Sequence, residues 1–419
     1  MMKQNRVFIT GIGMVTSHGI GKEQGFSALL EGKPCVIPIP DSFNDHYTFK
    51  SHFYVPFPCF DLSSFGIHSR YIKMMQDEDQ IAVLCAYLAL KDAGISIEPH
   101  NTHFRINDYA DTGVLIGTGF SGLQTAFNSY CAHAYSEKTA LKYNRLVIPM
   151  TMPNSVAAWV SIFFGIQGSS ITINASCASG TVALGRAYRL IQSGHYKAIL
   201  AGGVECLKES TGAIMRGFDV LGTLTKSGDG APLPFSEQRS GFLFSEGGGS
   251  LLLLEECDHA LQRGAPVYAE IVDFRENSDA FGIVQINPDA LQIIKLLGNL
   301  KANRQIDYIN THGTATLTND STEALAINKV FGKKETQPLV NATKGILGHT
   351  IGASGAIEAA VTALSIKKNR IHGSGVPDSL DINLVPHSIE REITYALSVS
   401  YGFGGHNAGL LFKRHKMNE

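Results

Sequence analysis

The sequence lacks runs of basic residues and membrane-length apolar segments. It holds 35 Lys and Arg against 37 Asp and Glu, a formal net charge of −2, so it offers no basic stripe to neutralise nucleic-acid phosphates. No apolar stretch reaches the roughly 18 residues that a membrane helix requires, and the early run VFITGIGMV is too short and too broken by glycine for a secretory signal. We therefore expect no nucleic-acid binding, no membrane contact and no targeting segment.

Cysteine is sparse, odd in number and without paired spacing. Seven cysteines are scattered along 419 residues, lacking the close pairs that hold zinc and the even set typical of a disulfide framework. We therefore expect no metal site and a reducing, cytoplasmic location. Charged residues are also few, at 17% against 44% hydrophobic ones, which excludes intrinsic disorder and indicates a large buried core.

Glycine, by contrast, is abundant and lies in clusters between apolar runs. Short apolar runs of this kind predict buried strands that are covered on both faces. In the first part of the chain they are VFITGIG (7–13), GVLIGTG (113–119), ITINASC (171–177), AILAGGVE (198–205) and SLLLLEE (250–256). Residues 78–93 have helical spacing and stop at Gly94, while residues 171–205 predict a strand, a helix and a second strand paired in parallel.

The same make-up returns after about residue 260. The later apolar runs are YAEIVDF, YINTHG, LVNATKG and YALSVSYGFGG, with helix-like segments between them. This repetition predicts an α/β protein of two halves, residues 1–260 and 261–419. No Pro- or Ser-rich linker separates them, so we expect the halves to pack closely. Residues 34–69, rich in Pro, Phe and Ser, predict an irregular excursion.

Cys177 stands where a predicted strand gives way to a predicted helix, among small residues that leave room for a substrate. A thiol at a helix N-terminus meets free backbone N–H groups and the positive end of the helix dipole, so we expect its pKa to be lowered. Cys177 is therefore the candidate nucleophile. We expect the other six cysteines to be small buried hydrophobes.

Two histidines follow later predicted strands, His312 within NTHGTAT and His349 within KGILGH. Open parallel sheets gather functional residues at the carboxyl ends of their strands, so we expect Cys177, His312 and His349 to meet. Two histidines suit the stabilisation of an oxyanion or an enolate. The glycine-rich segment YGFGGHN (401–407) offers backbone N–H groups that could line an oxyanion hole.

Two other readings of these residues remain open from chemistry alone. A cysteine protease also pairs Cys with His, but there one His acts as base and an Asn or Asp orients it. The GxG patterns at 11–13 and 117–119 resemble part of a dinucleotide fingerprint and hence a dehydrogenase. Neither pattern is complete, which makes this signal weak.

Six motifs in order resemble one family closely, the β-ketoacyl-acyl-carrier-protein synthases of the elongating, Cys-His-His type within the thiolase-like superfamily. They are VFITGIGMVTSHG, NASCASG, PLPFSEQRSGFLFSEGGGSLLLLEE, THGTAT, KGILGHTIGASGAIE and YGFGGHNAG, and they span nearly the whole chain. The resemblance implies a duplicated thiolase-like fold in five layers, α-β-α-β-α. It also implies a dimer, with the cysteine in the N-terminal half and both histidines in the C-terminal half.

The resemblance implies a decarboxylating Claisen condensation. Position by position, Cys177 matches the nucleophile that accepts an acyl group from a carrier protein, and its N–H with that of Phe403 matches the oxyanion hole. His312 and His349 match the pair that drives malonyl decarboxylation and stabilises the enolate. Because His349 stands where the initiating synthases carry Asn, we expect a primer delivered on carrier protein rather than on acetyl-CoA.

Supporting groups follow from the same resemblance. Lys344 and Glu358 match a charged pair behind the histidines, and Thr314 and Thr316 match substrate-binding positions. No metal or organic cofactor is implied, because the phosphopantetheine arm belongs to the acyl carrier protein that is the expected partner.

The expected acyl tunnel departs from the family pattern at its floor. Phe120 falls where a smaller side chain often ends the tunnel, so we expect shorter, or flat and rigid, acyl chains. Val147 and Phe218 match positions near the same tunnel, and Phe403 matches its gate. The segment of residues 279–287 is a few residues shorter than in ordinary fatty-acid elongating synthases.

The same resemblance leaves the partners and the pathway partly open. Candidate contacts to an acidic carrier protein are Arg70, Lys73 and Lys142. We expect duty in fatty-acid synthesis or in a type II polyketide or polyene pathway, with a lean toward the latter. The alternative is a non-catalytic partner resembling the chain-length factors, which lack the nucleophile. Both a homodimer and a heterodimer with such a factor fit the sequence.

Overall fold

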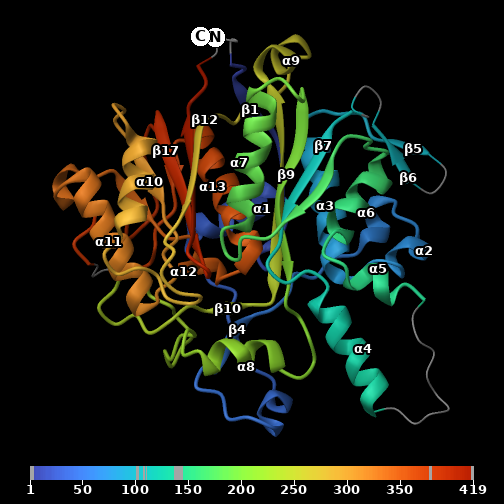
Figure 1. Ribbon diagram of the computed structural model, residues 1–419, viewed down its shortest axis with the longest axis horizontal. Helices are drawn as coiled ribbons and strands as arrows, with labels where there is room; N and C mark the ends of the chain where they lie inside the picture. The colour runs from blue at the N-terminus through green and yellow to red at the C-terminus, as the bar shows by residue number, and fades with distance from the viewer. Residues whose placement is uncertain are drawn as a thin grey trace.

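The central feature of the computed structural model is a mixed sheet made of two half-sheets with the same topology (Figure 1). The structure describes residues 4–100, 103–106, 109, 111–135, 145–376 and 380–416. The first half-sheet runs in the order β1 (Val7–Thr16), β11 (Gly247–Glu256), β9 (Ala198–Cys206), β7 (Gly113–Gly117) and β8 (Ser170–Ile173). The second runs in the order β12 (Ala269–Ser278), β18 (His406–Lys413), β17 (Tyr395–Gly402), β13 (Tyr308–Asn310) and β14 (Leu339–Asn341).

The pairing pattern shows that the second half-sheet repeats the first. In each, the first two pairings are antiparallel and the last two are parallel. The halves join edge to edge, where residues 7–9 of β1 pair antiparallel with residues 269–271 of β12. Strand order, direction and junction therefore agree with a duplicated unit.

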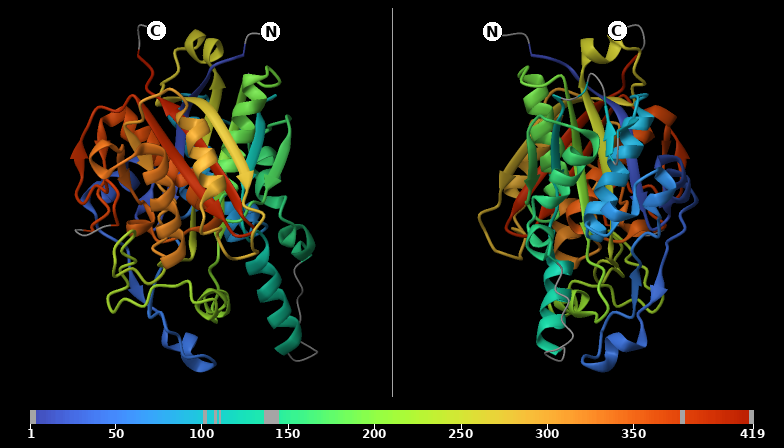
Figure 2. Two further views of the ribbon diagram at one scale, coloured as in Figure 1. Left: turned by 60° about the vertical axis from the view of Figure 1, so that its left-hand side comes forward. Right: turned by 90° about the vertical axis from the view of Figure 1, so that its right-hand side faces the viewer.

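Helices form three layers around the two half-sheets. α7 (Ser179–Gln192) and α13 (Ser354–Lys368) lie between them and contact each other as well as strands of both (Figure 1). α3 (Asp77–Asp92) and α6 (Ser155–Phe164) cover the outer face of the first half-sheet, and α10 (Leu291–Lys301) with α11 (Leu317–Phe331) covers that of the second (Figures 1 and 2). The five-layered α-β-α-β-α arrangement is confirmed.

α13 shows why the middle layer closes so tightly. Its residues 354–366 are all buried, and its sequence SGAIEAAVTALS is dominated by small side chains. Small residues let a helix approach sheets on both sides, while the remaining Ile, Val and Leu side chains fill the space between them. The two halves therefore share the hydrophobic core that surrounds this middle layer.

The unit at residues 171–205 differs from the expectation in two respects. β8 and β9 do run parallel, but β7 lies between them, so they do not pair directly. The expectation that residues 171–177 are buried on both faces is wrong for β8, where Ile171 is 47% exposed. The reason is position, because β8 is the edge strand of its half-sheet.

The remaining elements are short and surround this core. The further strands are β2 (Gly19–Ile20), β3 (Ile37–Pro38), β4 (Phe53–Val55), β5 (Glu98–His100), β6 (His103–Arg105), β10 (Phe244–Ser245), β15 (Arg370–Ile371) and β16 (Ile389–Glu390). The further helices are α1 (Lys22–Glu31), α2 (Ser69–Ile72), α4 (Leu123–Tyr135), α5 (Val147–Thr151), α8 (Ala213–Val220), α9 (Cys257–Gln262) and α12 (Lys344–Leu347). Single 3₁₀ turns are η1 (Asp41–Asp45), η2 (Leu62–Phe65), η3 (Lys334–Thr336) and η4 (Ile351–Ala353). No helix in the described ranges is long and apolar enough to cross a membrane.

The carboxyl ends of the parallel strands meet at one end of the molecule. β8 leads to Cys177, β13 to His312 and β14 to the segment with Lys344 and His349. β17 ends directly before Phe403. The duplicated topology thus brings segments from both halves to a single location, as open parallel sheets do.

Candidate active site

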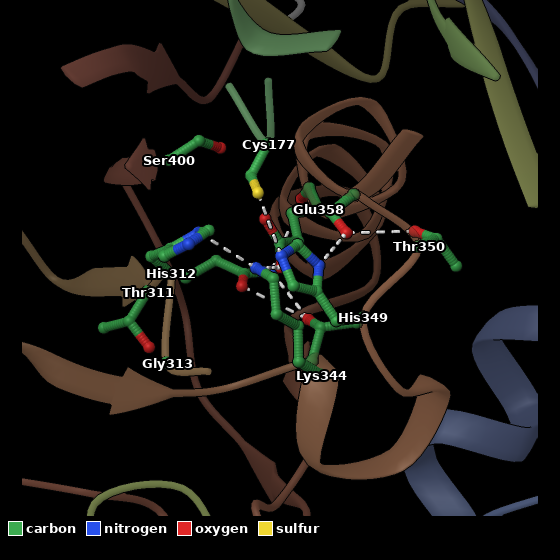
Figure 3. Close-up of polar contacts among 12 residues, drawn as sticks. Cys177, Thr311, His312, Gly313, Lys344, His349, Thr350, Glu358 and Ser400 are labelled. Carbon is green, nitrogen blue, oxygen red and sulfur yellow. Dashed lines mark hydrogen bonds and ion pairs between the residues drawn. The ribbon is translucent and has the colours of Figure 1, made fainter. Parts of the chain in front are cut away.

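Cys177 lies in a sharp turn between β8 and α7. Ser176 has the positive φ of 54° that is uncommon outside glycine, and Ser179 braces the turn. The Ser179 hydroxyl accepts the N–H of Ala175 at 2.9 Å and donates to the carbonyl of Ser176 at 2.6 Å. The turn directs the thiol toward the two histidines (Figure 3).

Hydrogen bonds assign the proton of His349 to its Nε2 atom. The N–H of Ile351 donates to His349 Nδ1 at 3.2 Å, and the Ser354 hydroxyl lies 3.0 Å from the same atom. An Nδ1 that accepts a backbone N–H carries no proton, so the neutral ring carries it on Nε2. Nε2 lies 3.2 Å from Cys177 Sγ (Figure 3).

His312 also carries its ring hydrogen on Nε2, for a different reason. Lys344 Nζ lies 3.2 Å from His312 Nδ1, and an ammonium group only donates, so Nδ1 accepts and Nε2 bears the hydrogen. The two imidazole rings are nearly perpendicular, with centroids 5.6 Å apart. The site therefore holds two imidazole N–H donors and one thiol in the lining of the same cavity.

Burial sets the protonation of all three groups. It lowers the pKa of His312 and His349, and the nearby Lys344 ammonium lowers both further, so both rings are neutral at pH 7. Burial also raises the pKa of the Cys177 thiol, outweighing the opposing effects of the Ser176 hydroxyl, Lys344 and the N–H of Phe403. The expectation of a lowered thiol pKa is therefore wrong for the free site, because the sulfur is buried among apolar side chains such as Phe218, Phe242 and Ile351.

Lys344 and Glu358 form a buried ion pair behind the histidines. Their Nζ and Oε1 atoms are 2.5 Å apart, and the side chains are 3% and 1% exposed. Burial raises the pKa of Glu358 to about 7, against the lowering effect of Lys344. Since an unpaired buried charge is costly, the carboxylate is what allows an ammonium to lie against His312.

These groups open into a cavity of about 360 Å³. Its walls include the predicted substrate-binding residues Phe120, Phe218, Thr314, Thr316 and Phe403. Phe120 and Phe218 meet edge to face, with ring centroids 6.1 Å apart. The cavity is therefore lined by aromatic rings on the side where the acyl tunnel is expected.

The end of β17 lies against the nucleophile turn. A Cβ atom on Gly402 would come within 2.7 Å of the Ala175 carbonyl and 3.1 Å of the Cys177 nitrogen, so this approach requires glycine. The N–H of the next residue, Phe403, is directed at Cys177 Sγ. The end of β17 thus lies against the backbone nitrogen of Cys177 and brings the N–H of Phe403 to its sulfur.

Comparison with known protein families gives the fold and the site a name. Residues 4–259 match the family described as Beta-ketoacyl synthase, N-terminal domain, and residues 268–375 match Beta-ketoacyl synthase, C-terminal domain. The chain belongs to the β-ketoacyl synthase family. The resemblance stated from the motifs is thereby confirmed, as are the thiolase-like fold and the acyltransferase class.

Curated relatives and solved structures of β-ketoacyl synthases match over almost the full length. The 3-oxoacyl-[acyl-carrier-protein] synthase 2 of Vibrio harveyi is 33% identical, covering 99% of both chains, and that of Staphylococcus aureus (strain COL) is 32% identical with the same coverage. A β-ketoacyl synthase from Burkholderia phymatum STM815 superimposes with a TM-score of 0.84 at 27% identity, over 98% of this chain and all of that one. A type II polyketide ketosynthase, bound to a hexaketide and in complex with its acyl-carrier protein, gives 0.85 at 25%, again over 98% and 100%.

Three predicted residues, Val147, Arg70 and Lys73, do not line the β-ketoacyl synthase cavity. Val147, at the start of α5, is not among the residues that line it, so its place in the tunnel stays a prediction. Arg70 on α2 and the adjacent Lys73 are exposed and also stay predictions as carrier-protein contacts. Lys142 lies outside the described residues.

Two buried acids of α11, Asp320 and Glu323, were not predicted from the sequence. Glu323 accepts the backbone N–H groups of His312 and Gly313, each at 2.9 Å, and Asp320 accepts those of Ala315 at 3.1 Å and Phe235 at 2.6 Å. Together they hold the His312 loop through its backbone. The available signal was two acidic residues three apart on the first turns of a helix directly after the THGTAT motif.

Proposed function

We propose that the chain is a β-ketoacyl-acyl-carrier-protein synthase that condenses an acyl group on Cys177 with malonyl-acyl-carrier protein. The observation that carries this proposal is the pair of neutral histidines, which carry their hydrogens on Nε2 and line the cavity together with Cys177. A protease-like site needs a base beside the sulfur. Two N–H donors instead stabilise negative charge on an oxygen.

The first half-reaction is acyl transfer. Cys177 Sγ attacks the thioester carbonyl of the acyl carrier, a new C–S bond forms, and the carrier thiol leaves with the proton that the Cys177 thiol gives up. The carbonyl oxygen becomes negative in the tetrahedral intermediate and is stabilised by the N–H groups of Cys177 and Phe403. Because burial raises the thiol pKa, this step starts from the thiol rather than from a resting thiolate.

The second half-reaction is decarboxylation and condensation. The malonyl C–C bond breaks, CO₂ leaves, and the electron pair becomes an enolate whose oxygen accepts the Nε2–H groups of His312 and His349. The enolate carbon attacks the acyl-Cys177 thioester, and the C–S bond breaks to release a β-ketoacyl carrier. Cys177 sulfur takes up one proton from solvent. No organic cofactor or metal enters this balance.

Carrier protein and pathway belong to the same proposal. The curated relatives are named for acyl-carrier-protein substrates, and the exposed Arg70 and Lys73 offer positive charge to an acidic carrier. The edge-to-face Phe120–Phe218 contact supports flat, unsaturated acyl chains and hence a type II polyketide or polyene pathway over fatty-acid synthesis. The boundary between the halves at residues 260 and 261 stays a prediction.

We also propose that the synthase is a dimer through the edge of β8. This strand carries Ile171, 47% exposed, and nearby helices expose Ile148, Met152 and Ile162 by 67%, 48% and 53%. An uncovered edge strand flanked by apolar side chains invites pairing with another strand. We propose that a second copy of this chain pairs with this edge. The alternative partner is a ketosynthase-like chain-length factor, and in that case light scattering would show the purified chain alone to be a monomer.

The deciding experiment follows protein masses. The unmodified synthase and Cys177→Ala are each mixed with acyl- and malonyl-carrier proteins of several chain lengths. An acyl adduct on the unmodified protein alone, followed by a β-ketoacyl carrier, supports the proposal. No adduct and no product with any carrier would instead support a non-catalytic, chain-length-factor-like role, which the presence of Cys177, His312 and His349 argues against.

A further inference from the structure

Glu205, near the carboxyl end of β9, is a fully buried carboxylate that joins the two halves of the site. Its Oε2 accepts the N–H groups of Gly119 and Gly352, both at 2.8 Å, and its Oε1 accepts that of Phe120 at 3.0 Å. Gly119 and Phe120 follow β7, whereas Gly352 belongs to η4, between His349 and α13. One side chain therefore holds an acyl-pocket loop and a histidine-bearing turn together.

The turn that Glu205 holds is strained. Ile351 has φ of 44°, a conformation that is unfavourable for a β-branched residue and persists only where neighbouring contacts impose it. Its N–H is the donor to His349 Nδ1, and its side chain lines the cavity. The bond from Gly352 to Glu205 fixes the other end of this peptide segment. Glu205 is therefore connected to the ring of His349 through two adjacent backbone N–H groups.

Two glycines make the contact close enough. A Cβ atom on Gly119 would lie 2.7 Å from Glu205 Oε2, and one on Gly352 would lie 2.3 Å from the Gly119 nitrogen. Real Cβ atoms do not approach neighbours so closely, so neither position accepts a side chain without movement. This gives the GTG pattern at 117–119 a structural purpose that needs no dinucleotide.

A second buried acid, Glu78, lies near Glu205, and the surroundings of the two show which of them bears the negative charge. Glu78 of α3 faces the hydroxyl groups of Thr118 and Ser121, and Thr118 Oγ1 lies 2.5 Å from Glu78 Oε1 and 3.4 Å from Glu205 Oε1. Burial raises the pKa of both acids, that of Glu78 further. Since Glu205 accepts three backbone N–H groups, the negative charge lies on Glu205 and the proton on Glu78.

We propose that Glu205 is a positioning residue of the condensing reaction, which sets the acyl-pocket residue Phe120 and the His349 turn as one unit. This inference rests on the proposed function. It predicts that one change at Glu205 alters two measurable properties together, the preference for acyl chain length and the rate of malonyl decarboxylation. A residue that only supports the fold would lower both activities for every substrate alike.

The test compares Glu205→Gln with the unmodified synthase. Gln keeps the size of the side chain, but it has only one acceptor oxygen and places its NH₂ group against backbone N–H groups that themselves donate. We expect malonyl decarboxylation to fall at least about tenfold, since hydrogen bonds to a buried charge are lost. We also expect the ratio of Cys177 acylation rates for short and long acyl carriers, read by mass spectrometry, to change severalfold. Glu205→Asp, which keeps the charge but withdraws it, serves as the second variant and should change the same ratio.

A matched control is available on the same strand pair. Glu255 is also fully buried, with Thr10, Tyr109 and Arg263 as partners, but its position in β11 pairs with Ala198 rather than with the site end of β9. This places it about 23 Å from Glu205 at roughly 3.3 Å per strand residue. Glu255→Gln should lower the melting temperature without changing the acylation ratio. An unchanged ratio in whichever Glu205 variants fold overturns the inference, whereas absence of condensation by the unmodified synthase would instead overturn the proposed function.

Discussion

The edge strands of the two half-sheets lead into very different segments. In the first half, β8 is followed by a turn of five residues before α7 begins, and this turn carries only the thiol. In the second half, the equivalent strand β14 is followed by α12 and η4 before α13 begins, and this longer segment carries Lys344 and His349. The same topological position therefore carries the proposed nucleophile in one half and the proposed charge-stabilising groups in the other.

The next strands inward show the same division. β7 leads to Phe120 and the aromatic side of the cavity, whereas β13 leads to His312. Duplication of the fold thus gives two sets of strand ends around one cavity. In the proposed reaction, the first half contributes the acylated thiol and Phe120, and the second half contributes the two histidines. This division predicts that variants of Cys177 and variants of the two histidines impair different half-reactions.

The largest expected effect separates the half-reactions. His312→Ala and His349→Ala each remove one donor to the enolate, so malonyl decarboxylation should fall by about 10²-fold or more, while the acyl adduct on Cys177 still forms. Cys177→Ala should do the reverse, abolishing the adduct while CO₂ release from malonyl-carrier protein continues. Loss of adduct formation in both histidine variants would contradict the division. The measurements are intact mass for the adduct and CO₂ release for decarboxylation.

The next effect is on stability and concerns the buried pair of the second half. Lys344→Met leaves Glu358 without its partner in a site that is almost fully enclosed. We expect a loss of about 3–5 kcal/mol in unfolding free energy, because one member of a buried ion pair remains uncompensated. Urea denaturation measures it. Lys33→Met, which breaks an ion pair at the surface, is the control and should cost about 0–1 kcal/mol.

Much of the division of site residues between the two halves was predictable from the sequence, because these residues lie in short motifs. The glycine-bounded apolar runs and the motifs around Cys177, His312 and His349 predicted strand ends that converge. The insertion of β7 between β8 and β9 was not predictable, since a strand–helix–strand pattern gives direction but not adjacency. The raised thiol pKa and the contacts of Glu205 were also hidden, because burial and contacts between distant residues arise only in the folded chain; Glu205 and Gly352 are 147 residues apart.

A smaller effect concerns the pH dependence of stability. Burial raises the pKa of Glu323 to about 8, above the roughly 4.3 of an exposed Glu. The folded state therefore binds the Glu323 proton more tightly than the unfolded state does. The contribution of this proton to the free energy of unfolding is fully present below about pH 4 and is lost as the pH rises through about 8. Glu323→Gln cannot ionise and should flatten the decline of the urea midpoint between pH 5 and pH 8. An identical slope in the variant would contradict the buried, protonated state.

The smallest expected effect tests whether the first half also receives the carrier protein. Arg70→Glu and Lys73→Glu reverse charge on an exposed surface of the first half, so the KM for malonyl-carrier protein should rise about three- to tenfold, with kcat unchanged. The difference should shrink as salt is added, because exposed charges are screened. Lys329, in the last turn of α11 on the second half, provides the matched control. If Lys329→Glu raised the KM as much as Arg70→Glu, the carrier would be attracted by overall charge, and the first half would hold no distinct docking surface.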